Sequence, residues 1–177
     1  LQRRNEITHM RWSDLDRREK WWNIPAEFTK TKVPYRVPIT AEMLKIVREM
    51  EAAKLDPVWV FPRVAGNGPV PETNITRPFR ELIEAAGIAH FVPHDLLHTA
   101  TSQMTSMGIS EFDIGKVRHH TSQGTWTSTS RYNHYRYDRE KRQTLDLWNT
   151  RLLAIVSGNA PSSDVHELPY VNLSSRV

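Results

Sequence analysis

The chain contains no cysteine among its 177 residues. Disulfide bonds, thiolate metal sites and cysteine nucleophiles are therefore excluded, and the composition is compatible with a reducing cytoplasm. No apolar stretch approaches the ~18 to 20 residues of a membrane span, and no charged-then-apolar leader opens the chain. We therefore expect a soluble, unexported protein without a membrane partner.

Internal repeats and long low-complexity tracts are missing as well, so the chain has the size of one domain with a sizeable core. A second full domain would not fit. Lys and Arg number 24 against 20 Asp and Glu, which gives a formal net charge of +4 at pH 7. This modest positive excess favours a polyanionic partner but does not identify one, because many basic proteins never touch nucleic acid.

The two ends of the chain differ from its middle. Residues 1–7 have the pattern of the middle of a helix, with neither an N-cap residue nor a preceding turn, so we expect a further N-terminal portion before them. Residues 157–177 have turn-forming composition and no hydrophobic period, which predicts a flexible tail. The expected organisation is an N-terminally incomplete domain over residues 1–156, followed by this tail.

The middle of the chain first shows a pattern typical of strands. Three short runs rich in aromatic and β-branched residues, at 10–15, 21–26 and 35–39, are separated by charged turns. This pattern predicts a three-stranded antiparallel meander.

Hydrophobic spacing and end signals predict helices in the rest of the chain. These helices run from Thr40 to about Lys54, over about 75–86 before Gly87, from His94 to Met107, from Ser110 onward, and over about 138–155. The last helix should bury Leu145, Trp148, Leu152 and Ile155. Residues 121–129 are polar and should form a mobile loop. The expected fold is a mainly helical α+β domain with a small three-stranded antiparallel sheet.

Five side chains that could take part in catalysis or binding occur in a particular order. They are Arg3, Lys30 in a turn between strands, His94 at the start of a helix, His120 before the polar loop, and Tyr132 after it. Taken singly, each has a structural explanation, such as surface charge, turn formation or aromatic packing. Their order and setting favour a different interpretation.

The first part of this order resembles the tyrosine recombinases of the phage-integrase type. Residues 2–7 (QRRNEI), followed by 10–16 (MRWSDLD), resemble the first arginine box, in which a helix carrying R-x-x-E runs into a β-meander. Arg3 and Glu6 hold the positions of that motif. The stretches FTKTK and RVPI that follow look like the hairpin lysine and the next strand, and Lys30 is a better match to that lysine than Lys32.

The second box of the family has the core H-x-x-R, and residues 93–100 (PHDLLHTA) are similar to it. His94 matches, but Leu97 stands in place of the arginine. Residues i and i+3 of a helix share a face, so residue 97 should project beside His94 toward the phosphate, where leucine offers neither charge nor hydrogen bond. The resemblance therefore implies an impaired or engineered active site. Three accounts stay open: engineering, decay of a prophage gene, or compensation by Arg118 or by His98, which should point about 100° away from that face.

The last boxes surround the expected nucleophile. Residues 117–120 (VRHH) lie where prophage integrases carry their last histidine, and 131–135 (RYNHY) through 140–142 (EKR) resemble the nucleophile segment. His120 precedes Tyr132 by twelve positions, which suits the phage-type branch with its longer loop. The similarity extends over about residues 1–153.

The resemblance implies site-specific DNA recombination, the integration or excision of mobile DNA such as a prophage, in the cytoplasm of a bacterial or phage-infected cell. A tyrosine would form a 3′-phosphotyrosyl link, and this covalent intermediate keeps the bond energy, so neither cofactor nor metal is expected. The catalytic set would be Tyr132 as nucleophile, Arg3 as phosphate clamp, Lys30 as general acid, His94 and His120 as phosphate ligands or proton shuttles, and position 97. The DNA-binding set would be Arg4, Lys32, Arg118 and Arg131.

Double-stranded DNA is the expected partner, with self-association on DNA through the C-terminal segment. The alternative function is a catalytically inactive DNA-binding module of the same fold, and Leu97 is the feature that separates the two. A type IB topoisomerase shares the nucleophile chemistry but is disfavoured by the phage-like segment around Tyr132. A basic helical domain that binds DNA without any site is the third possibility.

Overall fold

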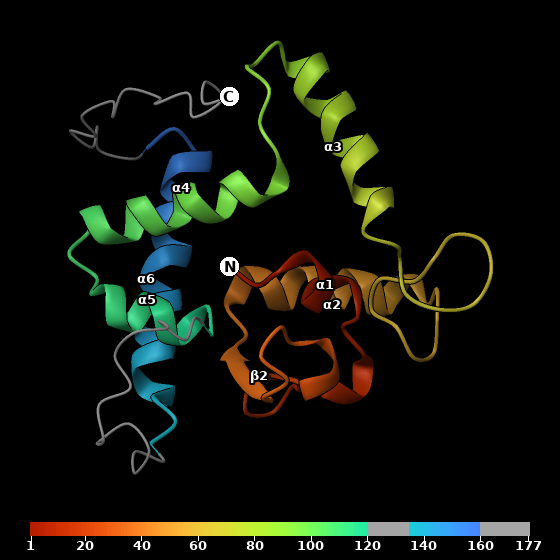
Figure 1. Cartoon of the computed structure of the whole chain (residues 1–177), viewed down its shortest axis with the longest axis horizontal. Coiled ribbons are helices and arrows are strands. Elements are labelled where there is room, and N and C mark those ends of the chain that lie inside the picture. The colour runs from red at the N-terminus through yellow and green to blue at the C-terminus, as the bar shows by residue number, and fades with distance from the viewer. Residues whose placement is uncertain (120–134, 160–177) are drawn as a thin grey trace, which may run out of the picture.

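The computed structural model describes residues 1–119 and 135–159, and statements about structure concern these residues (Figure 1). The helices are α1 (Arg4–Thr8), α2 (Ala41–Ala53), α3 (Thr73–Ala86), α4 (Pro93–Ser106), α5 (Glu111–Val117) and α6 (Asp138–Val156). The strands are β1 (Leu15–Asp16), β2 (Trp21–Ile24) and β3 (Tyr35–Pro38), and short 3-10 helices span Trp12–Asp14 and Ala26–Phe28. The mainly helical α+β fold with one small sheet is thus confirmed.

The sheet is the predicted antiparallel meander, with the order β1-β2-β3. Residues of β2 and β3 pair in the register Trp22 with Val37, and both side chains are buried. Together with Ile24, Met10 and Val60 they form the core of this half of the molecule. Side chains of α2 pack against the same cluster, which places α2 on the sheet (Figure 1).

The prediction of a first strand over residues 10–15 is wrong for most of that range. Residues Trp12–Asp14 form a 3-10 helix, and only Leu15–Asp16 pair with β2. The backbone of the preceding residues pairs elsewhere: Arg11 forms an antiparallel bridge with Trp59, and the Val60 amide donates to the Met10 carbonyl over 2.9 Å. The apolar run of residues 58–61 therefore provides residues 10–12 with the backbone partners that β2 was expected to provide.

Local end signals set the helix boundaries. The Thr40 hydroxyl accepts from the Met43 amide at 3.4 Å, and the Ser110 hydroxyl accepts from the Asp113 amide at 3.1 Å, so both predicted N-caps are confirmed. Gly87 ends α3 with φ +65°, the left-handed conformation in which a side chain would be strained.

Two helix predictions need correction. The first helix begins only at Arg4, because Arg3 is extended and the Glu6 carboxylate accepts its backbone N–H, so residues 1–3 are not helical. The buried face of α6 also ends early. Leu145 is buried, but Leu152 and Ile155 are 38% and 41% exposed. Helix α6 packs on β3 and α5, and its later part meets α4 through a hydrogen bond from Arg151 to Gln103.

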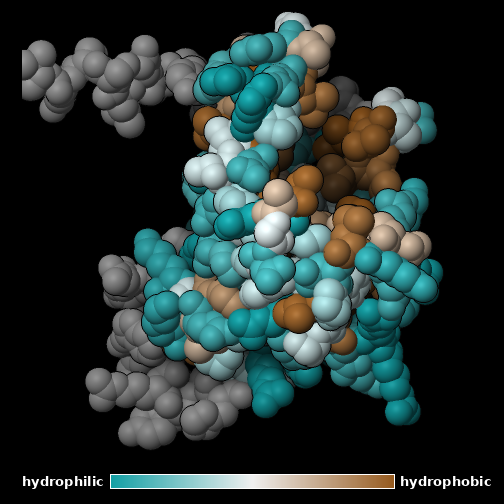
Figure 2. All heavy atoms as spheres, turned by 90° about the vertical axis from the view of Figure 1, so that its right-hand side faces the viewer, coloured by the Kyte–Doolittle hydropathy of each residue, from teal (hydrophilic) through white to brown (hydrophobic). Residues whose placement is uncertain are grey.

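Helix α3 is the most exposed of the long helices. Its Ile83 is buried, whereas Leu82 and the following Ile88 are 66% and 53% exposed. Figure 2, which views the side of the molecule that carries α3, shows hydrophobic side chains gathered in one area above a largely hydrophilic surface. Within residues 1–119 and 135–159, no helix combines the length and apolar character needed to cross a membrane.

Candidate active site

Side chains from the first and second boxes line one cavity of about 310 Å³. The lining residues are Gln2, Arg3, Arg4, Asn5, Glu72, Pro93, His94 and Leu97. Arg3, His94 and Leu97 are far apart in the sequence, but the structure brings all three to the same hollow. The N-terminal segment and the first turns of α4 are the two elements that position them.

Arg3 is held at the edge of this cavity by Glu6. The Glu6 carboxylate is 1% exposed and accepts from the Arg3 backbone N–H at 2.8 Å and from the guanidinium Nη1 at 3.2 Å. The Tyr35 hydroxyl donates to the same carboxylate over 2.9 Å. Burial, and then the negative charge of Glu6, raise the pKa of Tyr35, so this phenol stays protonated and remains a donor. The arrangement fixes the guanidinium and leaves its other N–H groups for an anion.

His94 lies in the first turn of α4, directly after Pro93 at the N-terminus of the helix. The Asp95 carboxylate accepts from the Val92 amide at 2.8 Å, which fixes the start of the helix. The His94 ring is exposed and makes an edge contact with His98, at a centroid distance of 4.9 Å. His98, which we expected to point away from this face, is thus a direct neighbour of His94.

The turn before β3 carries both candidate lysines. Lys32 has φ +54°, and its ammonium donates to the Glu27 carbonyl over 3.1 Å, so this side chain is folded back onto the protein. Lys30 is exposed, and its ammonium has no hydrogen-bonding or ionic partner within residues 1–119 and 135–159. Lys30 is therefore the lysine of this turn that is available to a ligand.

The C-terminal end of α5 joins the motifs through side-chain contacts. Gln2 donates to the Val117 carbonyl at 2.8 Å, and the Thr31 hydroxyl lies 3.0 Å from His119 Nε2. In the VRHH segment of residues 117–120, Val117 therefore contacts the first box and His119 contacts the lysine turn.

Five further predicted residues complete the set, and of these Arg118 directly follows α5 and donates through Nη1 to the Thr101 hydroxyl over 3.1 Å. Arg4 is exposed, with Nε 3.5 Å from the Glu72 carboxylate and Nη1 3.4 Å from the Thr76 hydroxyl. His120, Arg131 and Tyr132 lie outside the residues that the structure describes.

His119 was not among the residues predicted from the sequence, although it lies next to His120. Its ring stacks on Tyr35, with 4.1 Å between ring centroids and 5° between planes. Burial, and then the positive charge of Lys141, lower the pKa of His119, so its neutral form is favoured in the folded protein. The only sequence signal for His119 was the pair of adjacent histidines, and a pair of histidines does not show which of the two rings packs against the protein.

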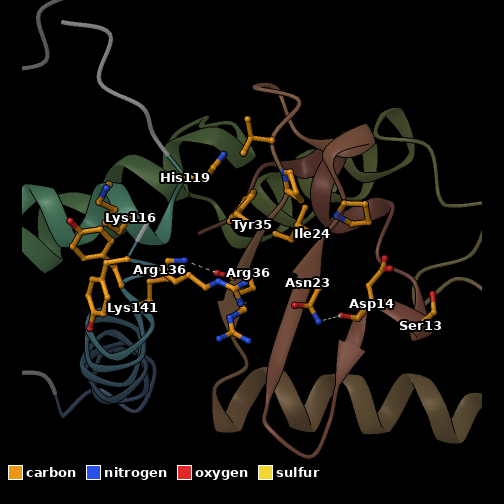
Figure 3. Close-up of a pocket in the computed structure, with 16 residues that line it drawn as sticks. Ser13, Asp14, Asn23, Ile24, Tyr35, Arg36, Lys116, His119, Arg136 and Lys141 are labelled. Atoms are coloured by element: carbon orange, nitrogen blue, oxygen red, sulfur yellow. Dashed lines mark hydrogen bonds between the residues drawn. The ribbon is translucent and has the colours of Figure 1, made fainter. Parts of the chain in front are cut away.

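A larger cavity of about 680 Å³ lies between strands β2 and β3 on one side and α5 with the start of α6 on the other (Figure 3). Of the predicted catalytic residues that the structure describes, which are Arg3, Lys30, His94 and Leu97, none lines this cavity. Its walls include Tyr35, Arg36, His119 and Lys141, and the Lys141 ammonium donates to the Arg36 carbonyl at 3.1 Å. Arg36 also forms an ion pair with Asp138. These contacts attach both His119 and the start of α6 to β3, on the two sides of residues 120–134.

Comparisons with known proteins agree with this arrangement of motifs. The family model described as "Phage integrase family" matches residues 1–139. Comparisons with curated proteins and with solved structures found no match. The match covers most of the chain, including all the motifs through the segment of Tyr132. The chain therefore belongs to the phage integrase family.

Proposed function

We propose that this chain carries out site-specific recombination of DNA by breaking and rejoining strands through a 3′-phosphotyrosyl intermediate. The main support is the cavity that Arg3, His94 and residue 97 share, whose lining residue Gln2 also binds the end of α5. The reaction would integrate or excise mobile DNA in the cytoplasm of a bacterial or phage-infected cell. Membership of the phage integrase family supports this class of reaction.

Tyr132 is the proposed nucleophile. Its hydroxyl oxygen attacks the scissile phosphorus and passes its proton to His94 or His120, the bond from phosphorus to the 5′-oxygen breaks, and the 5′-oxygen leaves with a proton from Lys30. The free 5′-hydroxyl of a partner strand then attacks the phosphotyrosyl link, which restores the phosphodiester and the tyrosine. Each exchange breaks one phosphoester bond and forms another, so the reaction needs no external energy source.

The other proposed roles follow from the side-chain chemistry. A planar guanidinium meets two phosphate oxygens at once, so Arg3 stabilises the charge of the transition state. His94 and His120 bind the phosphate or move protons. The DNA backbone contacts are assigned to Arg4, Arg118 and Arg131, and to Lys32 once its ammonium exchanges the Glu27 carbonyl for a phosphate. Self-association on DNA is assigned to the C-terminal segment, most of which lies outside the described residues.

A second candidate function is a DNA-binding module of this fold without catalytic activity. Leu97 favours it, because this side chain lines the cavity beside His94 and supplies no donor there. Loss of one transition-state donor typically reduces the rate by about 10² to 10³.

A suicide DNA substrate distinguishes the two functions. The probe is a library of nicked duplexes with a randomised central sequence, in which the short cleaved fragment diffuses away and the covalent adduct accumulates. A strand transferase yields protein-linked DNA on a denaturing gel, and Tyr132→Phe abolishes the adduct but not binding. A protein that retains DNA on a native gel without forming any adduct is instead the binding module.

A further inference from the structure

Arg118 occupies a specific place beside the second box. It follows α5 directly, and its Nη1 donates to the Thr101 hydroxyl over 3.1 Å. That hydroxyl in turn donates its proton to the Leu97 carbonyl at 2.8 Å. Thr101 lies one helical turn after Leu97 on α4, about 6 Å along the axis. The guanidinium of Arg118 is thus attached to α4 at the turn that follows the missing arginine.

Arg118 is also close to the first box. The Gln2 side chain binds the carbonyl of Val117, the residue before Arg118, and Gln2 is the neighbour of Arg3 in the chain. Burial, and then the positive charge of Arg3, lower the pKa of Arg118. The two positive charges therefore repel each other, although Arg118 does not itself line the cavity that Arg3 shares with His94 and Leu97.

The two arginines differ in their partners. Arg3 is paired with Glu6, whereas Arg118 has no carboxylate partner within residues 1–119 and 135–159. A half-buried cation that faces another cation is unfavourable by itself, and an oxyanion placed between them relieves the repulsion. A cation without a carboxylate partner, as Arg118 is within the described residues, is the arrangement expected of a group that binds an anionic ligand.

We propose that Arg118 supplies the guanidinium that Leu97 does not, and that it binds the scissile phosphate together with Arg3. The proposal rests on the strand-transfer function above, and it makes the present active site complete rather than impaired. His98 is a weaker substitute, because an imidazole has its two ring nitrogens on different sides and cannot bind two phosphate oxygens in one plane as a guanidinium does. Arg118 is therefore a catalytic residue rather than only one of the DNA-binding residues.

The test compares three variants with the parent in single-turnover formation of the adduct. The parent cleaves, Arg118→Gln is slower by about 10² to 10³, and Leu97→Arg alone changes the rate less than about threefold. The double variant Leu97→Arg/Arg118→Gln returns to within about tenfold of the parent, because the guanidinium is restored from α4. Arg80→Gln is the matched control: it removes the same charge from an exposed arginine of α3 that pairs with Glu84, and the rate stays unchanged.

Glutamine is too short to keep the bond that Nη1 makes to Thr101, so the urea midpoint of Arg118→Gln is measured beside the rate, and a structural role alone predicts that stability falls together with the rate. If this variant unfolds, Arg118→Lys replaces it, with an expected loss of about tenfold because an ammonium binds as a single point charge. A second measurement uses a substrate with a neutral methylphosphonate at the scissile position. The rate deficit of the variant should shrink at least about tenfold on this substrate, because less charge develops there.

The possible results separate this inference from the proposed function. If the parent cleaves and Arg118→Gln matches it, or if Leu97→Arg fails to rescue the double variant, Arg118 is not the second clamp, while strand transfer stands. If the parent is inactive and Leu97→Arg is active, the site is correct and the compensation is wrong. If both bind the library and neither forms an adduct, the proposed function fails and this inference fails with it.

Discussion

The imidazole ring of His119 lies flat on the phenol ring of Tyr35, with ring centroids 4.1 Å apart. The Thr31 hydroxyl contacts the Nε2 atom of the same imidazole at 3.0 Å. His119 is partly buried and near Lys141, and both surroundings oppose a positive charge on the ring. The neutral form of this histidine is therefore favoured in the folded protein.

The stability of the protein should depend on pH through this histidine. The pKa of His119 is lowered on folding, so below its ordinary value of 6.5 the unfolded chain takes up a proton that the folded chain does not. Folding stability is complete above that pH and decreases as the pH falls toward the lowered pKa. We expect the urea midpoint to fall between pH 7.5 and 5.5, and to fall less in His119→Phe. Equal decreases in both proteins would show that other groups cause the pH dependence.

Removal of the Glu6 carboxylate should destabilise the domain. Glu6→Ala leaves the Arg3 guanidinium and the buried Tyr35 hydroxyl without their acceptor, which should lower the free energy of unfolding by about 2 to 4 kcal/mol. Glu81→Ala is the control, because this exposed carboxylate pairs with Arg77 on the surface of α3 and should change stability by less than about 0.5 kcal/mol. Urea titrations of both variants measure the difference, and similar losses would contradict the assigned role of Glu6.

DNA binding should weaken steeply with salt, and Lys30 should contribute to that dependence. Each lysine that neutralises a phosphate of duplex DNA adds about −0.9 to the slope of log K against log salt concentration. Lys30→Gln should make the slope shallower by about that amount. Lys45→Gln, which changes an exposed residue of α2, should leave it unaltered. Fluorescence anisotropy from 50 to 300 mM salt gives the slopes, and an unchanged slope for Lys30→Gln would remove Lys30 from the DNA interface.

The two lysines of the turn should differ in catalysis. Lys32 is already bonded to the Glu27 carbonyl, so Lys30→Gln should slow cleavage by about 10² to 10⁴ while Lys32→Gln changes it by less than about threefold. A substrate with sulfur as the bridging 5′ atom leaves without a proton and should restore the rate of Lys30→Gln. The reverse order of effects would assign the acid to Lys32.

Much of the fold follows from local signals in the sequence. Thr40, Ser110 and Gly87 set helix ends because their side chains or backbone freedom act within one turn of the chain. The meander is similarly local, since short turns connect its strands. The order of the boxes predicted the residues that share the smaller cavity, including the departure at Leu97.

The remaining features depend on contacts between distant segments. Residues 10–12 pair with the chain near Trp59 instead of β2, and no local pattern distinguishes these two partners. The end of α6 keeps a helical apolar stripe, but no element covers Leu152 and Ile155 within the described residues. The bond from Arg118 to Thr101 likewise depends on how α5 meets α4.

The two attachments to β3 have a consequence for how such a protein evolves. His119 is fixed on Tyr35, and Asp138 is paired with the adjacent Arg36, so two points that flank residues 120–134 in the sequence are held at neighbouring positions of one strand. Doubling the length of chain between two fixed points costs only about 0.6 kcal/mol. Insertions or deletions that change the spacing between His119 and Tyr132, the proposed nucleophile, should therefore cost the domain little stability.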